Sequence, residues 1–174
     1  MKKELITYYL TLSQVFPSTH CQAGEPTHFK DAFKAGQVFG RGSECLYRHP
    51  KLHTIRTNYD FWARRFEKIL AGEAVLSIRE WVGKPYGKGS TQREIARLTR
   101  DDGIGLQRLT VAGPSITFHP LFVDGVAVSS ETLAQNDGLS VPDWRNWFAN
   151  YKADGPLAVI QFTKFRYQYN KIEL

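Results

Sequence analysis

The chain has 174 residues and a net charge of +6, and 42% of its residues are hydrophobic and 23% charged, a balance typical of one globular domain. No stretch approaches the roughly 20 consecutive apolar residues of a membrane span, and the segment Met1 to Leu10 lacks the long apolar run of a signal peptide. We therefore expect one cytoplasmic domain over residues 1–174 without a membrane partner, and the charge favours an anionic partner, nucleic acid first. A basic surface without a special role would explain the charge equally well.

The first third of the chain predicts two strands separated by a short helix and a loop. The Thr-, Tyr- and Leu-rich segment 5–16 has the composition of a strand. A short helix is expected over 28–35. Residues 36–50 contain three glycines and a proline and show no clear period, so we expect a loop there, followed by a strand over 51–57.

The remainder predicts one amphipathic helix and then many short strands. Asn58 or Asp60 is expected to cap a helix that ends at Leu70. Its apolar stripe consists of Phe61, Trp62, Phe66, Ile69 and Leu70. Further strands are expected over 74–82, 93–99, 106–112, 116–123, 126–129 and 157–165, and helices over 130–135 and 140–151. This order predicts an α+β fold built on a mixed, partly closed β-barrel with helices over its ends.

The segment Lys51-Leu52-His53-Thr54-Ile55-Arg56 carries a resemblance to a known family. The order Phe29…Phe33, then Lys-x-x-Thr-Ile-Arg, then the apolar run Val75–Arg79 resembles the ASCH family, whose fold is a PUA-like β-barrel. The segment Ala158–Phe162 is similar to the closing strand of that family. The resemblance spans about residues 29–165. Residues 1–28 would then be an N-terminal extension, and 36–49 and 59–72 would be insertions relative to compact bacterial members.

The resemblance implies binding of RNA or of a modified nucleoside in a basic cleft at Lys51–Arg56. Some compact members are amidohydrolases that remove the acetyl group of N4-acetylcytidine with a Lys, a Thr and a Glu. The Lys and the Thr match Lys51 and Thr54. The expected position of the Glu holds Asn136, and an amide cannot exchange a proton as a carboxylate does. Hydrolysis therefore requires that the neighbouring Asp137, or Glu131 one turn earlier, reaches the site.

The same residues can be interpreted without the resemblance. In a strand, Thr54 and Arg56 share one face, and Lys51 would point away unless Pro50 makes the entry to the strand irregular. A Thr hydroxyl needs an adjacent base to become a nucleophile, and a Lys amine can be that base only if its pKa is lowered. Arg56 could be the cation that lowers it, or it could bind a phosphate through its planar guanidinium. The structural alternative is an ordinary strand with Lys51 as a solvated edge charge.

A second group of residues interleaves cations with rings. It consists of Arg79, Trp81, Lys84, Tyr86 and Lys88. Such a pattern suits phosphate contacts combined with base stacking. The glycines of the 83–90 loop would let it fold over a ligand. Alternatively, Trp81 packs in the core and the loop is only a soluble connection.

Metal chemistry is weakly indicated. Cys45, His49 and His53 are spaced by four, and the pair His20-Cys21 lies upstream, which are ligand types that zinc accepts. However, no Cys-x-x-Cys pair occurs, Pro50 would break a helix joining the three residues, and the resemblance implies no metal. We therefore assign no metal and no cofactor.

Three functional hypotheses follow for this chain. The first is a binding module for RNA or a modified nucleoside, with Arg56, Arg79, Trp81, Lys84 and Tyr86 as its ligand-binding residues. The second is an amidohydrolase with Lys51 as base, Thr54 as nucleophile, and Asp137 or Glu131 as the acid. A ribonuclease that uses Thr54, Lys51 and His53 is the third.

Overall fold

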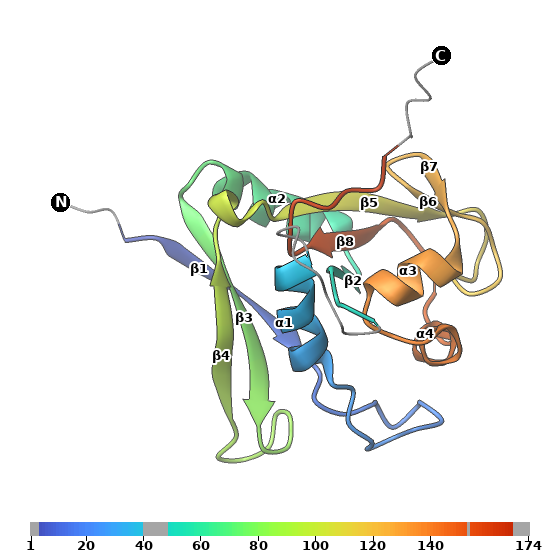
Figure 1. Cartoon of the computed structure of the whole chain (residues 1–174), viewed down its shortest axis with the longest axis horizontal. Coiled ribbons are helices and arrows are strands. Elements are labelled where there is room, and N and C mark those ends of the chain that lie inside the picture. The colour runs from blue at the N-terminus through green and yellow to red at the C-terminus, as the bar shows by residue number, and fades with distance from the viewer. Residues whose placement is uncertain (1–3, 40–48, 153, 169–174) are drawn as a thin grey trace.

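The computed structural model describes residues 4–39, 49–152 and 154–168. Within these ranges the strands are β1 (Ile6–Leu12), β2 (His53–Arg56), β3 (Ala74–Val82), β4 (Thr91–Leu98), β5 (Gly105–Val111), β6 (Leu121–Val123), β7 (Val126–Val128) and β8 (Leu157–Gln161). The helices are α1 (Phe29–Phe39), α2 (Tyr59–Leu70), α3 (Ser130–Asn136) and α4 (Val141–Phe148), and a short 3-10 helix spans Arg100–Asp102. The chain is therefore of the α+β class (Figure 1).

The strands form two sheets in the described part of the chain, which corrects the expectation of a barrel. A three-stranded sheet has the order β1-β3-β4, and a five-stranded sheet has the order β2-β8-β5-β6-β7. The closing segment takes the central position expected for it, since β8 pairs with both β2 and β5. The sheet edges at β1 and β2 are not joined by a backbone ladder. Instead, the Arg56 side chain reaches from β2 and donates to the carbonyl oxygen of Thr11 at 2.9 Å.

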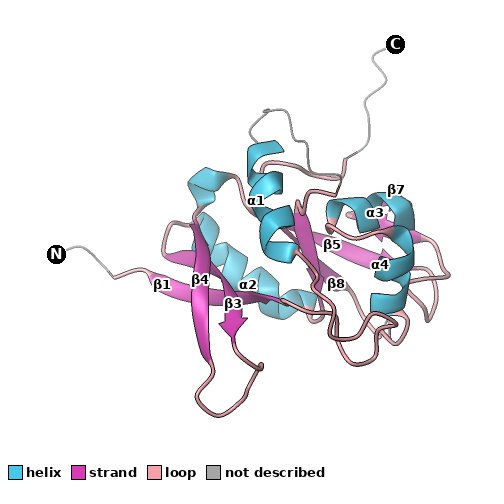
Figure 2. Cartoon of the chain, turned by 60° about the horizontal axis from the view of Figure 1, so that its bottom comes forward, coloured by secondary structure: helices cyan, strands magenta, loops and turns pink. Residues whose placement is uncertain are grey.

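The helices fill the space between and beside the two sheets. α1 runs between them in both views (Figures 1 and 2). α2 packs against β3, β5 and β8, so it touches both sheets, and α3 packs against α4. No helix among the described residues has the length and apolar character needed to cross a membrane.

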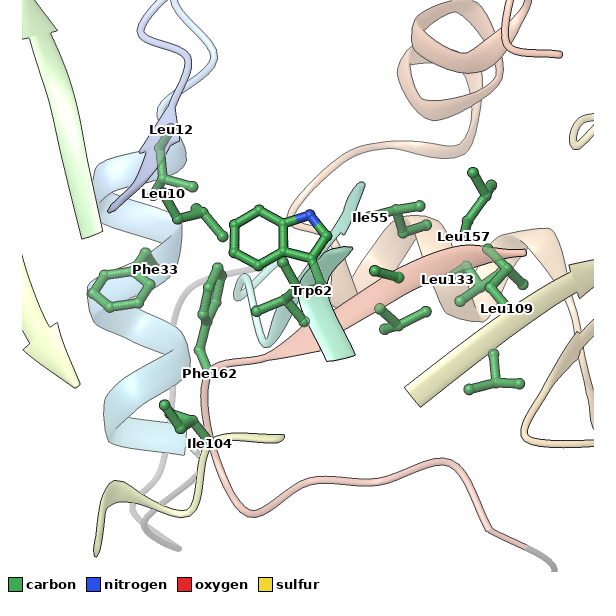
Figure 3. Packing of buried hydrophobic residues seen from close by; sticks show 14 of the residues in the cluster. Leu10, Leu12, Phe33, Ile55, Trp62, Ile104, Leu109, Leu133, Leu157 and Phe162 are labelled. Carbon is green, nitrogen blue, oxygen red and sulfur yellow. The ribbon is translucent and has the colours of Figure 1, made fainter. Parts of the chain in front are cut away.

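One hydrophobic core links these layers. Phe33 of α1, Trp62 of α2 and Phe162 after β8 meet at its centre, and Leu10 and Leu12 of β1 close one side (Figure 3). The other end of the core is built from Ile55, Leu109, Leu133 and Leu157. Of the predicted α2 stripe, Trp62, Phe66 and Ile69 are buried, whereas Phe61 and Leu70 are 38% and 52% exposed.

Two element boundaries near the N-terminus differ from the sequence prediction. β1 ends at Leu12, and Val15 pairs instead with Pro26, so the chain folds back on itself before α1. α1 continues through Gly36 to Phe39, where the sequence predicts a loop. Gly36 is tolerated inside this helix because the packing against Lys51 requires a residue without a side chain.

Candidate functional site

A buried ion pair between Lys51 and Asp137 forms the centre of the candidate site. Lys51 Nζ lies 2.5 Å from Asp137 Oδ1 and also donates to the Asp137 carbonyl oxygen at 2.7 Å. The two residues are 1% and 3% exposed. Lys51 is therefore buried, which rules out the alternative of a solvent-exposed charge at the edge of a sheet. Its ammonium lies 4.0 Å from the centre of the Phe29 ring, which gives the cation a second favourable partner.

One face of α1 forms a wall of this site. Phe29, Ala32 and Gly36 recur at helical spacing. The Ala32 carbonyl accepts the backbone N–H of Lys51 at 2.8 Å. A Cβ at Gly36 would overlap the Lys51 carbonyl, so the helix approaches the Lys51 backbone as closely as it does only because this position lacks a side chain.

The C-terminal end of α3 brings the carboxylate into place. Asp137 is the C-cap residue of α3, and Gly138 follows with φ +77°, the left-handed conformation that ends helices. Asp137 pairs with Lys51 in an isolated antiparallel bridge, and Leu52 N donates to the Asn136 carbonyl at 2.7 Å. Lys51 thus lies in irregular backbone ahead of β2, as the preceding Pro50 suggests.

Burial shifts the pKa values of both charged partners in opposite directions. Desolvation lowers the pKa of Lys51, although Asp137 opposes the shift and Arg56 adds to it. Desolvation raises the pKa of Asp137, against the charges of Lys51 and Arg56. Both shifts reduce the free-energy difference between the ionised pair and the neutral pair. Burial thus brings the proton affinities of Nζ and Oδ1 closer together than they are in water.

Thr54 and Arg56 lie side by side on β2, as the strand alternation predicts. Arg56 Nη1 donates to Thr54 Oγ1 at 2.9 Å and to the Ile55 carbonyl at 3.1 Å. Burial lowers the pKa of Arg56, and the charge of Asp137 opposes that shift. Among the described residues the Thr54 hydroxyl shares a hydrogen bond with Arg56 and none with Lys51. Its own hydrogen is thus left without an acceptor in this part of the chain.

The expected open cleft at Lys51–Arg56 needs correction. Lys51 and Thr54 are 1% and 3% exposed, so both line the interior. The physical reason is that the ammonium is neutralised by Asp137 and covered by Phe29, which removes its need for water. Arg56 is the residue of this group that keeps partial exposure.

Asn136 and His53 belong to a neighbouring polar network. The Tyr167 hydroxyl accepts from Asn136 Nδ2 and lies 2.9 Å from His53 Nε2. Burial, together with the Lys51 charge, lowers the pKa of His53 well below its ordinary value. His53 therefore stays neutral and lies on the strand face opposite Thr54. Sequence reasoning missed Tyr167, because nothing local marks a residue whose partners are more than 30 positions away.

Glu131, the alternative acid, does not reach the site. It is an exposed residue of α3 that pairs with Arg145 at 3.1 Å. The carboxylate beside Lys51 is that of Asp137.

The second predicted group lies on the three-stranded sheet. Arg79 and Trp81 belong to β3, and Lys84 and Tyr86 to the loop that follows it. Trp81 is only partly buried, and Tyr86 is 89% exposed. No contact among the described residues joins these four side chains to Lys51 or Asp137. Sequence reasoning assigns the two groups to one site, whereas the structure places them on different sheets.

The candidate metal ligands do not form a set of free donor atoms. Cys45 lies outside the described residues. His20, Cys21 and Asp143 bring one ligand atom each within 4.8 Å. However, His20 Nδ1 accepts from the Gln22 N–H at 3.0 Å and Nε2 lies 3.0 Å from the Asp143 carbonyl, so both ring nitrogens already have partners. This arrangement docks the loop before α1 onto α4.

Comparison with family models, with curated proteins and with solved structures finds no match to this chain.

Proposed function

We propose that this protein is an ASCH-type amidohydrolase that acts on a small N-acylated nucleoside, with Lys51, Thr54 and Asp137 as its catalytic residues. The observation that carries the proposal is the carboxylate of Asp137 at 2.5 Å from Lys51 Nζ in a buried position. Buried ionisable groups with opposed pKa shifts concentrate at functional sites. N4-acetylcytidine is the substrate that the resemblance implies.

The reaction would pass through an acetyl ester on Thr54. Lys51, as the neutral amine, accepts the Thr54 hydroxyl proton while the Thr54 oxygen bonds to the acetyl carbon. The bond from that carbon to the exocyclic nitrogen breaks, and the nitrogen takes the proton from Lys51, which releases cytidine. A water molecule then attacks the ester and passes one proton to Lys51. That proton returns to the Thr54 oxygen as acetic acid leaves, and the acid gives up its remaining proton to solvent as acetate.

The Lys51–Asp137 pair and Arg56 each support this sequence of proton transfers. Burial lowers the pKa of Lys51 and raises that of Asp137, and both directions favour the neutral amine that the first step needs. Arg56 already donates to Thr54 Oγ1 at 2.9 Å, and a cation in that position stabilises negative charge as it develops on the oxygen. The partial exposure of Arg56 marks the side from which a nucleoside would approach.

The same geometry favours hydrolysis over the two other hypotheses for this site. A phosphate-binding cleft needs cations with free charge, and the Lys51 charge is compensated by Asp137. A ribonuclease would need His53 as a further acid–base group, and His53 bonds to Tyr167 on the strand face opposite Thr54.

The test is incubation of the purified chain with N4-acetylcytidine, with cytidine release followed by chromatography. Wild type should release cytidine and Thr54→Ala should not. Thr57→Ala is the matched control, because Thr57 is exposed and lies just beyond β2, and it should keep wild-type turnover. Absence of cytidine release by folded wild type would reject the proposal.

A further inference from the structure

The three-stranded sheet presents an outer face that the proposed hydrolase does not use. Strand alternation sends Leu76 and Ile78 into the core, and Arg79 and Trp81 lie on the opposite face of β3, where both are partly exposed. The pairing register of β1, β3 and β4 places residues of the three strands next to one another on that face. We call this set, with Tyr86 of the loop after β3, the outer face; its members are Tyr9, Arg79, Trp81, Tyr86, Glu94, Arg97 and the fully buried Ser77.

Rings and cations alternate along this face. The Arg79 guanidinium lies 4.2 Å from the centre of the Tyr9 ring, and Tyr9 is 52% exposed. Trp81, two residues along the same strand face, meets the Tyr86 ring at a centroid distance of 4.9 Å. Tyr86 is 89% exposed and Trp81 is partly exposed, so the Tyr86 ring stands open to solvent. Tyr9 lies opposite Ser77, four residues before Trp81 along β3, so the two aromatic positions are about 13 Å apart along the strand direction.

Polar contacts hold the cations of the face in fixed positions. Arg79 Nε donates to Ser77 Oγ at 3.0 Å, and Ser77 Oγ donates to Glu94 at 2.5 Å. Glu94 also pairs with Arg97 at 3.2 Å, so the acid offsets one of the two arginines. Lys84 and Lys88 in the adjoining 83–90 loop are exposed, and that loop contains no acidic residue. The face and its loop therefore carry net positive charge.

We infer that the outer face binds single-stranded nucleic acid by stacking bases on Tyr9, Trp81 and Tyr86, with Arg79 and the loop lysines on the phosphates. Exposed rings beside cations bind unpaired bases, since every base has a π-face and every nucleotide a phosphate. In a duplex the base faces are stacked on one another, so a duplex would bind this face only through the attraction between its phosphates and the cations. The inference goes beyond the hydrolase proposal and does not depend on it. The outer face nevertheless borders the candidate hydrolase site at Thr11. Thr11 is the strand partner of Arg79, and its carbonyl oxygen accepts a hydrogen bond from Arg56.

Fluorescence anisotropy of a labelled oligouridylate of about 12 nucleotides tests the inference. The double variant Tyr9→Thr/Tyr86→Ser removes the two most exposed rings of the face without opening the core. Its dissociation constant should rise about 5- to 150-fold for each ring that stacks a base. Lys84→Ala together with Lys88→Ala should reduce the slope of log K against log salt by about 0.7 for each phosphate that the variant no longer neutralises.

Three comparisons separate stacking from unspecific attraction. Phe118→Ala removes a ring that is 85% exposed between β5 and β6, and should leave binding unchanged. Duplex RNA of equal length should bind more weakly than the single strand. Thr57→Ala should also bind as wild type does, and the assay measures no turnover, so failure of the hydrolase proposal would not touch this result. Equal binding of the single strand by wild type and the double ring variant, or no binding by wild type at about 50 mM salt, would overturn the inference.

Discussion

Lys51 is the residue on which the candidate site depends, because its ammonium is enclosed between the Asp137 carboxylate and the Phe29 ring. A buried charge is stable only with a partner and hydrogen bonds. Here the backbone carbonyl of Asp137 supplies one of those bonds in addition to the carboxylate. The two residues therefore form a buried unit whose hydrogen bonds are satisfied, and its disruption should be measurable apart from any activity.

Asp137→Asn should lower the free energy of unfolding by about 3–5 kcal/mol, because it leaves the Lys51 charge buried without its counter-ion. Urea denaturation at neutral pH measures the loss. The double variant Lys51→Met/Asp137→Asn should be less destabilised than the sum of its single variants, since the uncompensated charge is gone.

Glu131→Gln is the matched control for that cycle. This substitution breaks the ion pair between Glu131 of α3 and Arg145, which is exposed to solvent. Exposed ion pairs contribute little to stability, so the urea midpoint should equal that of wild type. Strict additivity of the Lys51 and Asp137 substitutions would contradict the description of the two residues as a coupled pair.

The sequence was sufficient to select Lys51, Thr54 and Asp137 as candidates, but not to show how they are enclosed. Thr54 and Arg56 share a strand face as period-two alternation requires. Lys51 has the sequence signature of an edge charge, and its burial depends on α1, a helix more than ten residues upstream. Long-range packing of this kind leaves no local pattern in the chain.

At the level of elements, α1 is the helix whose packing defines the site. The sequence predicts too short a helix because Gly36 indicates a helix end when judged by propensity alone. The structure shows a different role, since the glycine gives the Lys51 backbone room to approach. By contrast, α2 and β3 match the sequence prediction at both ends, because each has strong local signals, with Asn58 capping α2 through a hydrogen bond to Phe61 N.

Gly36→Ala should destabilise the protein by about 1–3 kcal/mol, although alanine favours an isolated helix by about 1 kcal/mol. The reason is the overlap of the new Cβ with the Lys51 carbonyl. Thermal or urea unfolding measures the change. Gly155→Ala is the control, because no atom lies within 4 Å of a Cβ there, and its effect should stay within about 0.5 kcal/mol. A stabilising effect of Gly36→Ala would contradict the packing described for α1.

Glu80 joins three elements and should make their association depend on pH. It accepts hydrogen bonds from Lys30 of α1 and Arg93 of β4. Burial alone would raise the pKa of Glu80, but the hydrogen bonds from these cations outweigh it and hold the pKa below the ordinary 4.5. Folding therefore favours the ionised form, and this contribution is present above pH 4.5 and lost as the pH falls through the lowered value.

The free energy of unfolding of Glu80→Gln should consequently be lower than that of wild type at pH 7, and the difference should shrink as the pH falls below 4.5. Urea denaturation over a pH series measures it. Glu73→Gln, an exposed residue just before β3, should show no such pH-dependent difference. A gap between Glu80→Gln and wild type that stays constant down to low pH would contradict the assigned ion pairs.

For the whole molecule, the α+β class could be predicted from the sequence, whereas the division into two sheets could not. The number and order of short strands is compatible with one curved sheet or with two. At the edges of β1 and β2, the Arg56 side chain rather than a backbone N–H bonds to the Thr11 carbonyl. A single side-chain contact between distant segments has no signature in composition or periodicity.

Thr54 as the acyl-bearing nucleophile, with Lys51 as its base, is the central claim, and rapid-quench mass spectrometry with N4-acetylcytidine tests it most directly. We predict that the peptide containing Thr54 gains the mass of one acetyl group in wild type, and that Thr54→Ala neither gains it nor releases cytidine. Cytidine release by Thr54→Ala at the wild-type rate, or an acetyl group found on a different residue, would contradict the account.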